Sequence, residues 1–405
     1  MTIGYNIAGT GLTRVMHSLV KRLADQHEIH YLGIGYSGAV VRDRGLTMYP
    51  TNPKGGDVFA AFQAKRLIEE IHPSVVLILH DIWLFDYYLR LLGPYRNGLK
   101  IAAYIPLDGA IVREENAASL EQADRVVAYT QFARAEFEGA FRRLREKEAT
   151  RNFPAVDVIP HGIDRDRFFP LPELAQASFA STGRVHAKKR VFGDAADLAE
   201  SFVVLNASRP DKRKRVDLTV QGFARFAAGK PPNVRLCLHH AIMDDDIERK
   251  LVRLIRECGL GERVSLNPLG TRVVTDADLN LLFNACDVGI TTSMGEGWGQ
   301  VSCEHGAAGA AQIVPDHTAC AELWRGRGEL IPPARSYVPE FSPLEMGEVS
   351  AEGVADALET LYRDPARTQA LARAAVTDNP APSWDVVARQ FDDLIGGLAR
   401  DSNAN

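Results

Sequence analysis

The feature that most constrains this chain is an alternation of short apolar runs with amphipathic segments. A run such as Val75–Leu79 has the length and the β-branched content of a buried strand. The segment that follows the first such run repeats apolar residues every three or four positions, at Leu12, Val15, Met16, Leu19, Val20 and Leu23. This alternation is typical of parallel sheets with crossover helices. We therefore expect an α/β protein with doubly wound sheets.

The expected strands form two groups separated by a break in this rhythm. The first group covers residues 3–7, 29–34, 75–79, 101–105, 125–129 and 156–160, and the second covers 202–205, 234–238, 264–266, 288–291 and 312–314. The break contains Pro170, Pro172 and the basic run Lys188–Arg190. A chain of 405 residues supports two domains at about 100–200 residues each. We predict domains over 1–168 and 201–380, a linker or surface excursion over 169–200, a loop over 332–347 and a last helix over 383–399.

Composition and charge exclude several classes of protein. A net charge of −5 argues against bulk nucleic-acid binding. No apolar run approaches the roughly 20 residues that span a bilayer, and the first residues lack the basic and apolar regions of a signal peptide. The five cysteines include no Cys-x-x-Cys pair, which favours reduced thiols over disulfides or a zinc site. We expect a cytoplasmic protein without a zinc site.

A basic loop follows the first expected strand of the second domain. Residues 206–217 read Asn-Ala-Ser-Arg-Pro-Asp-Lys-Arg-Lys-Arg-Val-Asp, and an amphipathic segment comes next. Ligands bind α/β sheets at the carboxyl ends of strands, where cations can neutralise a diphosphate. The alternative is a solvated charged turn. The position after a strand favours phosphate binding, with Arg209 and Lys214 among the cations.

A glycine-rich turn with two glutamates follows a later strand. Glu296 lies in the turn, Glu304 lies in the helix expected after it, and Gly297, Trp298, Gly299 and Gln300 lie between them. Carboxylates suit sugar and ribose hydroxyls, and the free amides at a helix start suit phosphate oxygens. One such turn could therefore hold both parts of a nucleotide sugar. The alternative is a capped helix with two incidental acids.

The first domain offers weaker candidates. Gly9 and Gly11 flank Thr10 between the first strand and the first helix, where a ligand could approach the helix N-terminus or where a plain tight turn could form. Arg14 occupies the last glycine position of a dinucleotide-binding fingerprint, which is therefore not met. His80-Asp81 and Asp108 each follow a strand, where polar side chains more often fix loops than catalyse. His239 and His240 are adjacent on a strand and should point apart, so chelation is not expected.

These residues resemble the retaining GT-B glycosyltransferases of family 4. Residues 158–164, Val-Ile-Pro-His-Gly-Ile-Asp, followed by Phe168 or Phe169, match the inter-domain turn of that family. Arg209 and Lys214, with Asp217 three positions further on, match its phosphate-binding pair. Glu296 and Glu304 match its Glu-x7-Glu motif. The pattern covers nearly the whole chain.

The resemblance implies two Rossmann-like domains that face a central cleft, with the last helix packed back on the first domain. It implies that Arg209 and Lys214 hold the donor diphosphate, that Glu304 binds the ribose, and that Glu296 with the amides after it holds the transferred sugar. The loop with Gly11 would close over the phosphates. Because the cationic pair stabilises the leaving group, no metal is implied.

The chain departs from the family pattern at three positions that bear on the site. Ser208 stands where the family usually has glycine, and Arg215 stands where glycine usually follows the lysine. Asp108 stands where many members carry a histidine near the reacting carbon, and it could bind the sugar or orient the acceptor hydroxyl.

We predict a retaining transferase that moves a hexose-type sugar from a UDP-, GDP- or ADP-sugar to a hydroxyl acceptor. The alternatives are a non-catalytic module that binds nucleotide sugars and a sugar-nucleotide epimerase of the same architecture. The helix expected over 132–151 carries both phenylalanines and arginines, which would allow peripheral contact with an anionic membrane. A packed helix with a solvated basic face is the interpretation that we favour.

Overall fold

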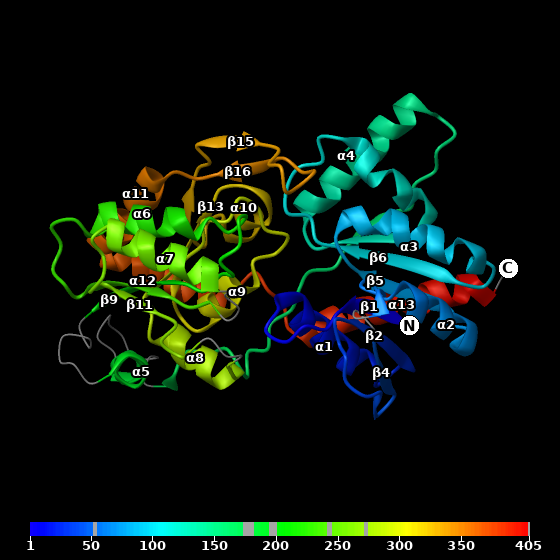
Figure 1. Ribbon diagram of the computed structural model, residues 1–405, viewed down its shortest axis with the longest axis horizontal. Coiled ribbons are helices and arrows are strands. Elements are labelled where there is room, and N and C mark those ends of the chain that lie inside the picture. The colour runs from blue at the N-terminus through cyan, green and yellow to red at the C-terminus, as the bar shows by residue number, and fades with distance from the viewer. Residues whose placement is uncertain (52–54, 173–181, 194–200, 241–244, 271–273, 404–405) are drawn as a thin grey trace. The chain divides into compact units, whose positions relative to one another are not determined.

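The computed structural model describes residues 1–51, 55–172, 182–193, 201–240, 245–270 and 274–403 (Figure 1). The chain forms two compact units. Unit 1 comprises Met1–Gly162, Pro339–Glu345 and Pro382–Asn405, and unit 2 comprises Ile163–Val338 and Met346–Ala381. Each unit contains one large, mainly parallel sheet, so the predicted α/β class is confirmed.

The sheet of unit 1 has eight strands in the order β3-β4-β2-β1-β5-β6-β7-β8. Neighbouring strands are parallel except for β3 and β4, which are antiparallel. The central strands are almost entirely buried because both faces of the sheet are covered, as their apolar runs predict. The strands are β1 (Thr2–Tyr5), β2 (Ile29–Ile34), β3 (Val41–Asp43), β4 (Leu46–Pro50), β5 (Val75–Leu79), β6 (Lys100–Ile105), β7 (Arg125–Ala128) and β8 (Val156–Val158).

Helix α1 (Gly11–Leu23) shows why the crossover segments of unit 1 are helical. Thr10 caps it by accepting a hydrogen bond from the backbone N–H of Thr13, and Lys21 and Arg22 lie in its last turn, where cations are favourable. The other helical elements of the unit are α2 (Ala61–Ile71), η2 (Ile82–Leu84), α3 (Phe85–Leu92), η3 (Gly93–Tyr95), η4 (Glu114–Gln122), α4 (Gln131–Lys147) and α13 (Trp384–Asn403).

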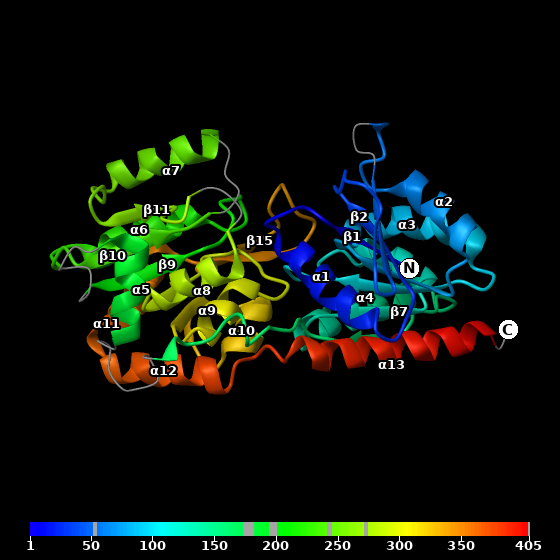
Figure 2. The ribbon, with the colours of Figure 1, turned by 90° about the horizontal axis from the view of Figure 1, so that it is seen from below.

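Helix α13 is the last element of the chain and packs within unit 1 (Figure 2). The ring of Phe391 lies 4.9 Å from that of Tyr104, and Trp384 packs against the turn at Gly162. A Cβ at Gly162 would lie 2.7 Å from the Cα of Trp384, so only glycine allows this approach. The turn in residues 158–164 therefore serves as the docking point of α13.

The basic helix α4 is paired with acids of its own unit. Lys147 lies 2.5 Å from a carboxylate oxygen of Glu114 and 2.7 Å from one of Glu115, while Phe137 and Phe141 are buried. This arrangement is that of a packed helix whose basic face is partly neutralised. In the part of the chain that the structure covers, no helix is both long and apolar enough to cross a membrane.

The sheet of unit 2 has six parallel strands in the order β11-β10-β9-β12-β13-β14. They are β9 (Phe202–Asn206), β10 (Val234–Leu238), β11 (Val264–Leu266), β12 (Val288–Ile290), β13 (Ala311–Pro315) and β14 (Glu329–Ile331). A separate antiparallel pair consists of β15 (Arg335–Tyr337) and β16 (Met346–Glu348). The helices are α5 (Thr182–Phe192), α6 (Val216–Ala227), α7 (Asp245–Glu257), α8 (Asp276–Asn284), α9 (Gln300–Ala307), α10 (Thr318–Trp324), α11 (Ala351–Arg363) and α12 (Pro365–Thr377).

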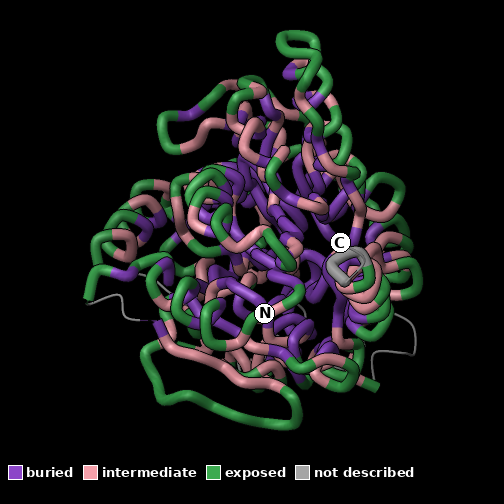
Figure 3. The backbone as a smooth tube through the Cα atoms, turned by 90° about the vertical axis from the view of Figure 1, so that its right-hand side faces the viewer, coloured by how far each residue is buried: buried purple, intermediate pink, exposed green. Residues whose placement is uncertain are grey.

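The core of unit 2 lies between the sheet and the helices that cover it. Val204, Leu236, Val288 and Ile313 of four different strands have no exposed surface, and Val354 of α11 joins them in one apolar cluster. Figure 3 shows the exposed residues concentrated in outer loops and on outward helix faces. The cluster fixes the strands whose ends carry the candidate site.

The structure differs from the sequence expectations in the segment 169–200. Helix α5 lies within it, and Lys188 of the basic run is buried, with its ammonium 2.9 Å from the Oδ2 of Asp287. Lys188 is therefore a paired core residue and not part of a surface excursion. The remaining parts of the expected linker, 173–181 and 194–200, lie outside the described residues. Strands β3, β4 and β14 were not expected, and β15 replaces part of the loop expected over 332–347.

Candidate functional site

The basic loop after β9 and the glycine-rich turn after β12 meet in unit 2. The Nζ of Lys214 lies 2.5 Å from the Oε1 of Glu296. The backbone N–H of Met294 donates to the carbonyl of Arg213 over 2.8 Å, which ties the two loops together. Both loops follow parallel strands of one sheet, and their carboxyl ends therefore meet at the same edge. The structure thus joins two of the four charged residues that the sequence singled out in this unit.

Arg213 is a member of this cluster that the sequence analysis did not select. Its Nη1 donates to the carbonyl of Gly295 and also to the Oε2 of Glu296, over 3.4 Å for the second bond. Its side chain is mostly buried. Residues 211–215 are one acid followed by four cations, and such a run has no apolar period that would show which side chain points inward. The sequence therefore carried no signal that Arg213 contacts Glu296.

Two cations keep the buried carboxylate of Glu296 ionised. Burial raises the pKa of Glu296, but Lys214 and Arg213 outweigh that effect and lower the pKa to about 2. An ionised carboxylate accepts hydrogen bonds and donates none. Glu296 is therefore suited to bind hydroxyl groups and is not suited to act as an acid at neutral pH.

The turn after Glu296 leads directly into helix α9. Gly299 has a φ of 91°, a left-handed conformation that favours glycine, and the helix begins at Gln300. Gly297 and Trp298 are buried in the turn. The first backbone N–H groups of a helix lack acceptors within it and favour anions. The start of α9 thus places backbone donors beside the Lys214–Glu296 pair.

Glu304 lies on α9 in a separate contact. It is buried, and its Oε1 accepts a hydrogen bond from the Nε2 of Gln300 over 3.2 Å, one helical turn earlier. Glu304 and Glu296 therefore have different environments, because Glu296 contacts cations and Glu304 contacts an amide. The second environment suits a neutral diol such as a ribose.

Arg209 is, with Lys212, one of the two exposed cations of the basic loop. Its side chain is 54% exposed, and its Nη2 lies 3.7 Å from the Oδ2 of Asp211. It does not join the buried cluster of Lys214, Arg213 and Glu296. An exposed guanidinium with one long ion pair can turn to an incoming phosphate at little cost.

Arg215 takes a backbone conformation that favours glycine. Its φ is 45°, in the left-handed region that costs a side-chain-bearing residue about 1–2 kcal/mol. The hydroxyl of Thr292 donates to the carbonyl of Arg215 over 2.7 Å. The guanidinium pairs with Asp217 and with the buried Glu348. These contacts offset the strain and keep the loop shape without a glycine.

The remaining candidates belong to unit 1. Gly11 is the first residue of α1, is exposed, and would leave open space around a Cβ. Asp108 follows β6 and is half-buried. His80 is fully buried, and burial lowers its pKa to about 4, so it is neutral at physiological pH. The meeting of Gly11 and Asp108 with a donor bound in unit 2 stays a prediction.

The structure shows how the two adjacent histidines of unit 2 are placed. Among the described residues, no group of three or more His, Cys, Asp or Glu side chains is arranged to hold a metal ion. His239 and His240 are both buried, and the Nδ1 of His240 is hydrogen-bonded to the carbonyl of Ser208. His240 thus holds the start of the basic loop by a hydrogen bond to its backbone. That a bound donor needs no metal stays a prediction.

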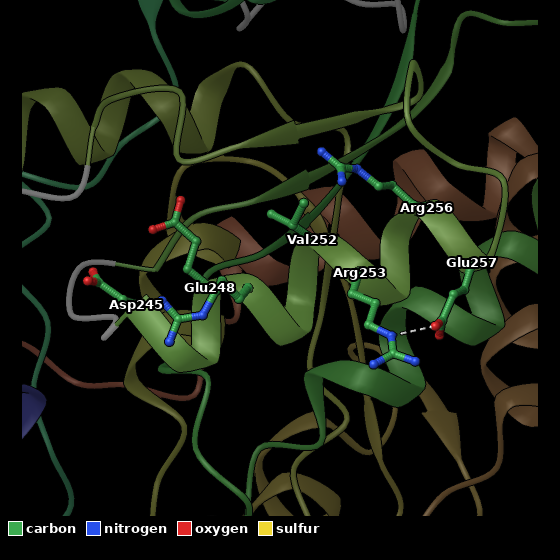
Figure 4. Close-up of a pocket in the computed structure, with 7 residues that line it drawn as sticks. Asp245, Glu248, Val252, Arg253, Arg256 and Glu257 are labelled. Atoms are coloured by element: carbon green, nitrogen blue, oxygen red, sulfur yellow. Dashed lines mark hydrogen bonds and ion pairs between the residues drawn. The ribbon is translucent and has the colours of Figure 1, made fainter.

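A depression of about 680 Å³ lies along helix α7 (Figure 4). All seven residues that line it come from that one helix, and all but Val252 are charged. Arg253 and Glu257 form an i,i+4 ion pair across one turn. This surface is a solvated helix face and shares no residue with the cluster around Glu296.

Comparison with known proteins adds a relative by sequence and several by structure. No protein-family model matches the chain. The mannosylfructose-phosphate synthase of Agrobacterium fabrum is 26% identical over 166 residues, which are 40% of this chain and 33% of that protein. The chain thus matches about a third of the length of this curated relative.

Solved structures match nearly the whole chain. The α,α-trehalose 6-phosphate synthase of Burkholderia multivorans has a TM-score of 0.72 and 16% identity, over 100% of this chain and 96% of that one. The sucrose-phosphate synthase of Thermosynechococcus elongatus has a TM-score of 0.70 and 18% identity, over 98% and 95%. HepE of Anabaena, in complex with UDP and glucose, has a TM-score of 0.69 and 16% identity, over 98% of each chain. At these identities the likeness establishes the fold.

Proposed function

We propose that this chain, which has the GT-B fold of glycosyltransferases, transfers a hexose-type sugar from a nucleoside-diphosphate sugar to a hydroxyl acceptor with retention of configuration. The observation that carries the proposal is the buried Lys214–Glu296 pair beside the start of α9. It sets a cation for a diphosphate next to a carboxylate for sugar hydroxyls. The UDP and glucose bound to the Anabaena protein support the same class of donor.

In the proposed reaction, the donor diphosphate binds Arg209, Lys214 and the first amides of α9. Glu304 accepts hydrogen bonds from the ribose, and Glu296 accepts them from hydroxyls of the transferred sugar, supported by the turn Gly297–Gln300. The acceptor oxygen attacks the anomeric carbon from the face that the diphosphate leaves. As the new C–O bond forms and the C–O bond to phosphate breaks, the acceptor proton passes to the departing phosphate. The cations meet the charge that grows on that phosphate.

Unit 1 is proposed to supply the acceptor side. Asp108, at the end of β6, would accept a hydrogen bond from the acceptor hydroxyl or from the sugar. Gly11 would let the start of α1 approach the phosphates, because it offers no side chain in that space. Neither role requires a metal ion.

The first experiment is a thermal-shift screen of the full chain with UDP, GDP, ADP and their sugars. A ligand at 100 times its Kd stabilises the folded state by about 2.7 kcal/mol, which gives a clear rise in Tm. The nucleotide that binds then defines the donor for a transfer assay, and NMR of the product gives its anomeric configuration. Binding without turnover would favour a non-catalytic module, and a donor converted to its stereoisomer without acceptor would favour an epimerase.

Variants of the basic loop test the roles of its cations. Arg209→Ala should lower kcat by about 10²–10³-fold without a change in Tm, because removal of one preorganised donor costs about that much and Arg209 is exposed. Lys212→Ala is the matched control, since Lys212 is an exposed cation of the same loop and should leave the rate unchanged. Equal rates for both variants would contradict the proposed leaving-group contact.

A further inference from the structure

Unit 1 carries an exposed apolar surface formed by two short segments. We call the side chains of Val58, Phe59, Phe62, Trp83 and Tyr87 the aromatic face. Phe62 is 76% exposed, and Val58 and Trp83 are each 52% exposed. Single exposed apolar residues are ordinary, but clustered aromatic residues on a folded surface mark a binding site.

The aromatic face lies at the edge of the sheet where ligands bind α/β proteins. Val58 and Phe59 lie in the connection between β4 and α2, and Phe62 lies in the first turn of α2. Trp83 lies in η2 and Tyr87 in α3, the two elements that follow β5. Both connections leave the carboxyl ends of parallel strands, which is the ligand-binding edge of such sheets. The hydroxyl of Tyr88 donates to the carbonyl of Phe59 over 2.8 Å and holds the two segments together.

The backbone that presents the face is strained and held in place. Ala60 has a φ of 63°, and it precedes α2 without providing a side-chain cap. The two carboxylate oxygens of Asp57 instead accept hydrogen bonds from the backbone N–H groups of Phe62 and Gln63, each over 3.1 Å. Strained turns that the surrounding structure fixes cluster at ligand sites.

A buried polar group lies directly behind the face. The ring of His80 is 4.6 Å from that of Tyr5 and 6.0 Å from that of Phe59, and its Nδ1 accepts a hydrogen bond from the backbone N–H of Asp81. The proton of the neutral ring is therefore on Nε2. Nowhere in the described ranges does an acceptor reach this Nε2. A buried donor without a partner is rare in folded proteins, and a ligand oxygen is one group that can satisfy it.

The charges around the face select against an anionic ligand. In residues 55–64 and 80–88 the acids are Asp57, Asp81 and Asp86, and these segments contain no lysine or arginine. The cations that follow these two segments are Lys65 and Arg66 on α2 and Arg90 on α3. Arg66 is paired with Glu70, and Arg90 is paired with Asp86 over 3.0 Å. A phosphate group bound to these two segments would face their carboxylates, which repel an anion.

We propose that the aromatic face binds the acceptor, and that this acceptor is an uncharged molecule whose hydroxyl is carried on an apolar or aromatic group, not a sugar phosphate. The inference deepens the proposed transferase function and rests on it for the reaction. Binding of the apolar group to the face is supported by the exposed aromatic side chains, by their position at the carboxyl edge of the sheet and by the acids of the two segments.

Trp83 provides a direct probe of binding. Trp298, Trp324 and Trp384 are buried, so a ligand on the face should change the fluorescence of Trp83 alone. Octyl β-glucoside below its micelle concentration should change the emission of the full chain in a saturable way, and Trp83→Phe should abolish the change. Glucose 6-phosphate at the same concentrations should have no effect. A saturable response to glucose 6-phosphate, or to phosphatidylcholine vesicles but not to octyl β-glucoside, would overturn the proposal.

A sugar-transfer assay tests whether the aromatic face binds the acceptor during the reaction. With the donor found by thermal shift, kcat/KM should be higher for octyl β-glucoside than for glucose 6-phosphate. Phe62→Ala should raise the KM for octyl β-glucoside about tenfold, the effect of losing one aromatic contact, and should leave kcat and donor hydrolysis unchanged. Val386→Ala is the control, because Val386 is a partly exposed apolar residue on α13 of the same unit and lies outside the face.

The donor assays distinguish a failure of the proposed function from a failure of the inference about the acceptor. If no nucleoside diphosphate shifts the Tm and no donor is hydrolysed, the proposed function fails, while the fluorescence titration still tests the face. If the donor binds and is hydrolysed but transfer prefers glucose 6-phosphate, the proposed function stands and this inference is wrong. An unchanged KM in Phe62→Ala would also overturn the inference.

Discussion

At the scale of single residues, Glu296 is an acid whose charge depends on its neighbours. Lys214 and Arg213 hold it between them, although it is buried. Lys214 has a structural role beside its proposed role in catalysis, because its removal would leave a buried carboxylate with one cation, Arg213. Loss of one member of a buried pair costs about 3–5 kcal/mol. We therefore expect Lys214→Ala to lower Tm as well as activity, unlike Arg209→Ala.

The pKa of Glu296 predicts a pH dependence of stability. Its pKa is lowered from 4.5 to about 2 in the folded protein, so its contribution is full above pH 4.5 and is lost as the pH falls toward 2. Between pH 7 and pH 3 this group should account for a loss of about 2 kcal/mol in unfolding free energy. Urea unfolding of the wild type and of Glu296→Gln at both pH values measures it.

The comparison between these two proteins isolates the group. Other carboxylates, such as Glu114, also titrate in this range and affect both proteins equally. The wild type should therefore lose about 2 kcal/mol more than Glu296→Gln does. Equal losses would show that Glu296 is not held ionised by the two cations.

Gly11 allows a separation of activity from stability. An alanine there would meet open space and would begin α1 with a better helix former, so Tm should stay the same or rise slightly. If the start of α1 approaches the donor, Gly11→Ala should lower kcat/KM at least tenfold by rough estimate, since a small misplacement is costly in catalysis. Gly139→Ala, within α4 of the same unit, is the control for a glycine change without a ligand nearby. Unchanged kinetics in Gly11→Ala would remove Gly11 from the proposed site.

The residues of the candidate site were predictable where chemistry and position agree. Lys214 and Glu296 follow two strands of one sheet and have opposite charges, so their meeting could be inferred from the sequence. Arg213 could not be inferred, because the choice among adjacent cations depends on the loop conformation. The positive φ of Arg215 could not be inferred from the sequence either, since it is stabilised by a hydrogen bond from Thr292 and by an ion pair with Glu348, both far away in the chain.

At the scale of elements, the docking of α13 depends on a single glycine. A Cβ at Gly162 would lie within 2.7 Å of both the Cα and the indole ring of Trp384. Gly162→Ala should destabilise the protein by about 1–3 kcal/mol, the usual effect of overpacking. Calorimetry measures this change. Gly139→Ala should be neutral or slightly stabilising, because its Cβ would make only an ordinary contact with Arg143, and equal effects of the two variants would show that α13 docks elsewhere.

The elements themselves were predictable where their burial leaves a periodic pattern. Strands β2, β5 and β10 have the bounds that their apolar runs predict, because buried parallel strands are apolar on both faces. The half-buried edge strand β11 also has the predicted bounds. Strand β3 is exposed along its whole length and therefore has no such run. The pair of β15 and β16 is held by contacts of Arg335 and Tyr337 with Glu348, which are not visible in a local pattern.

At the scale of the whole molecule, the two proposed ligands belong to different units. The residues proposed to hold the donor diphosphate and ribose lie in unit 2, and the aromatic face lies in unit 1. A nucleoside diphosphate should slow backbone hydrogen exchange most in 209–217 and 293–304, because bound segments open less often. Octyl β-glucoside should do so most in 57–62 and 82–88. Mass spectrometry of exchanged peptides measures both, and protection by the nucleotide confined to unit 1 would contradict the proposed donor site.

The return of α13 to unit 1 affects how the protein can be divided. Unit 1 is assembled from three separate stretches of chain, and its first stretch ends at Gly162, more than half the sequence before its last stretch begins. A gene fragment that stops near that glycine would contain Tyr104 but lack Phe391, whose ring packs against it, and would expose this buried aromatic contact to water. A circular permutant that joins the present ends and opens a surface loop of unit 2 would keep all three stretches, and it is the rational starting point for anyone who wishes to produce one half alone.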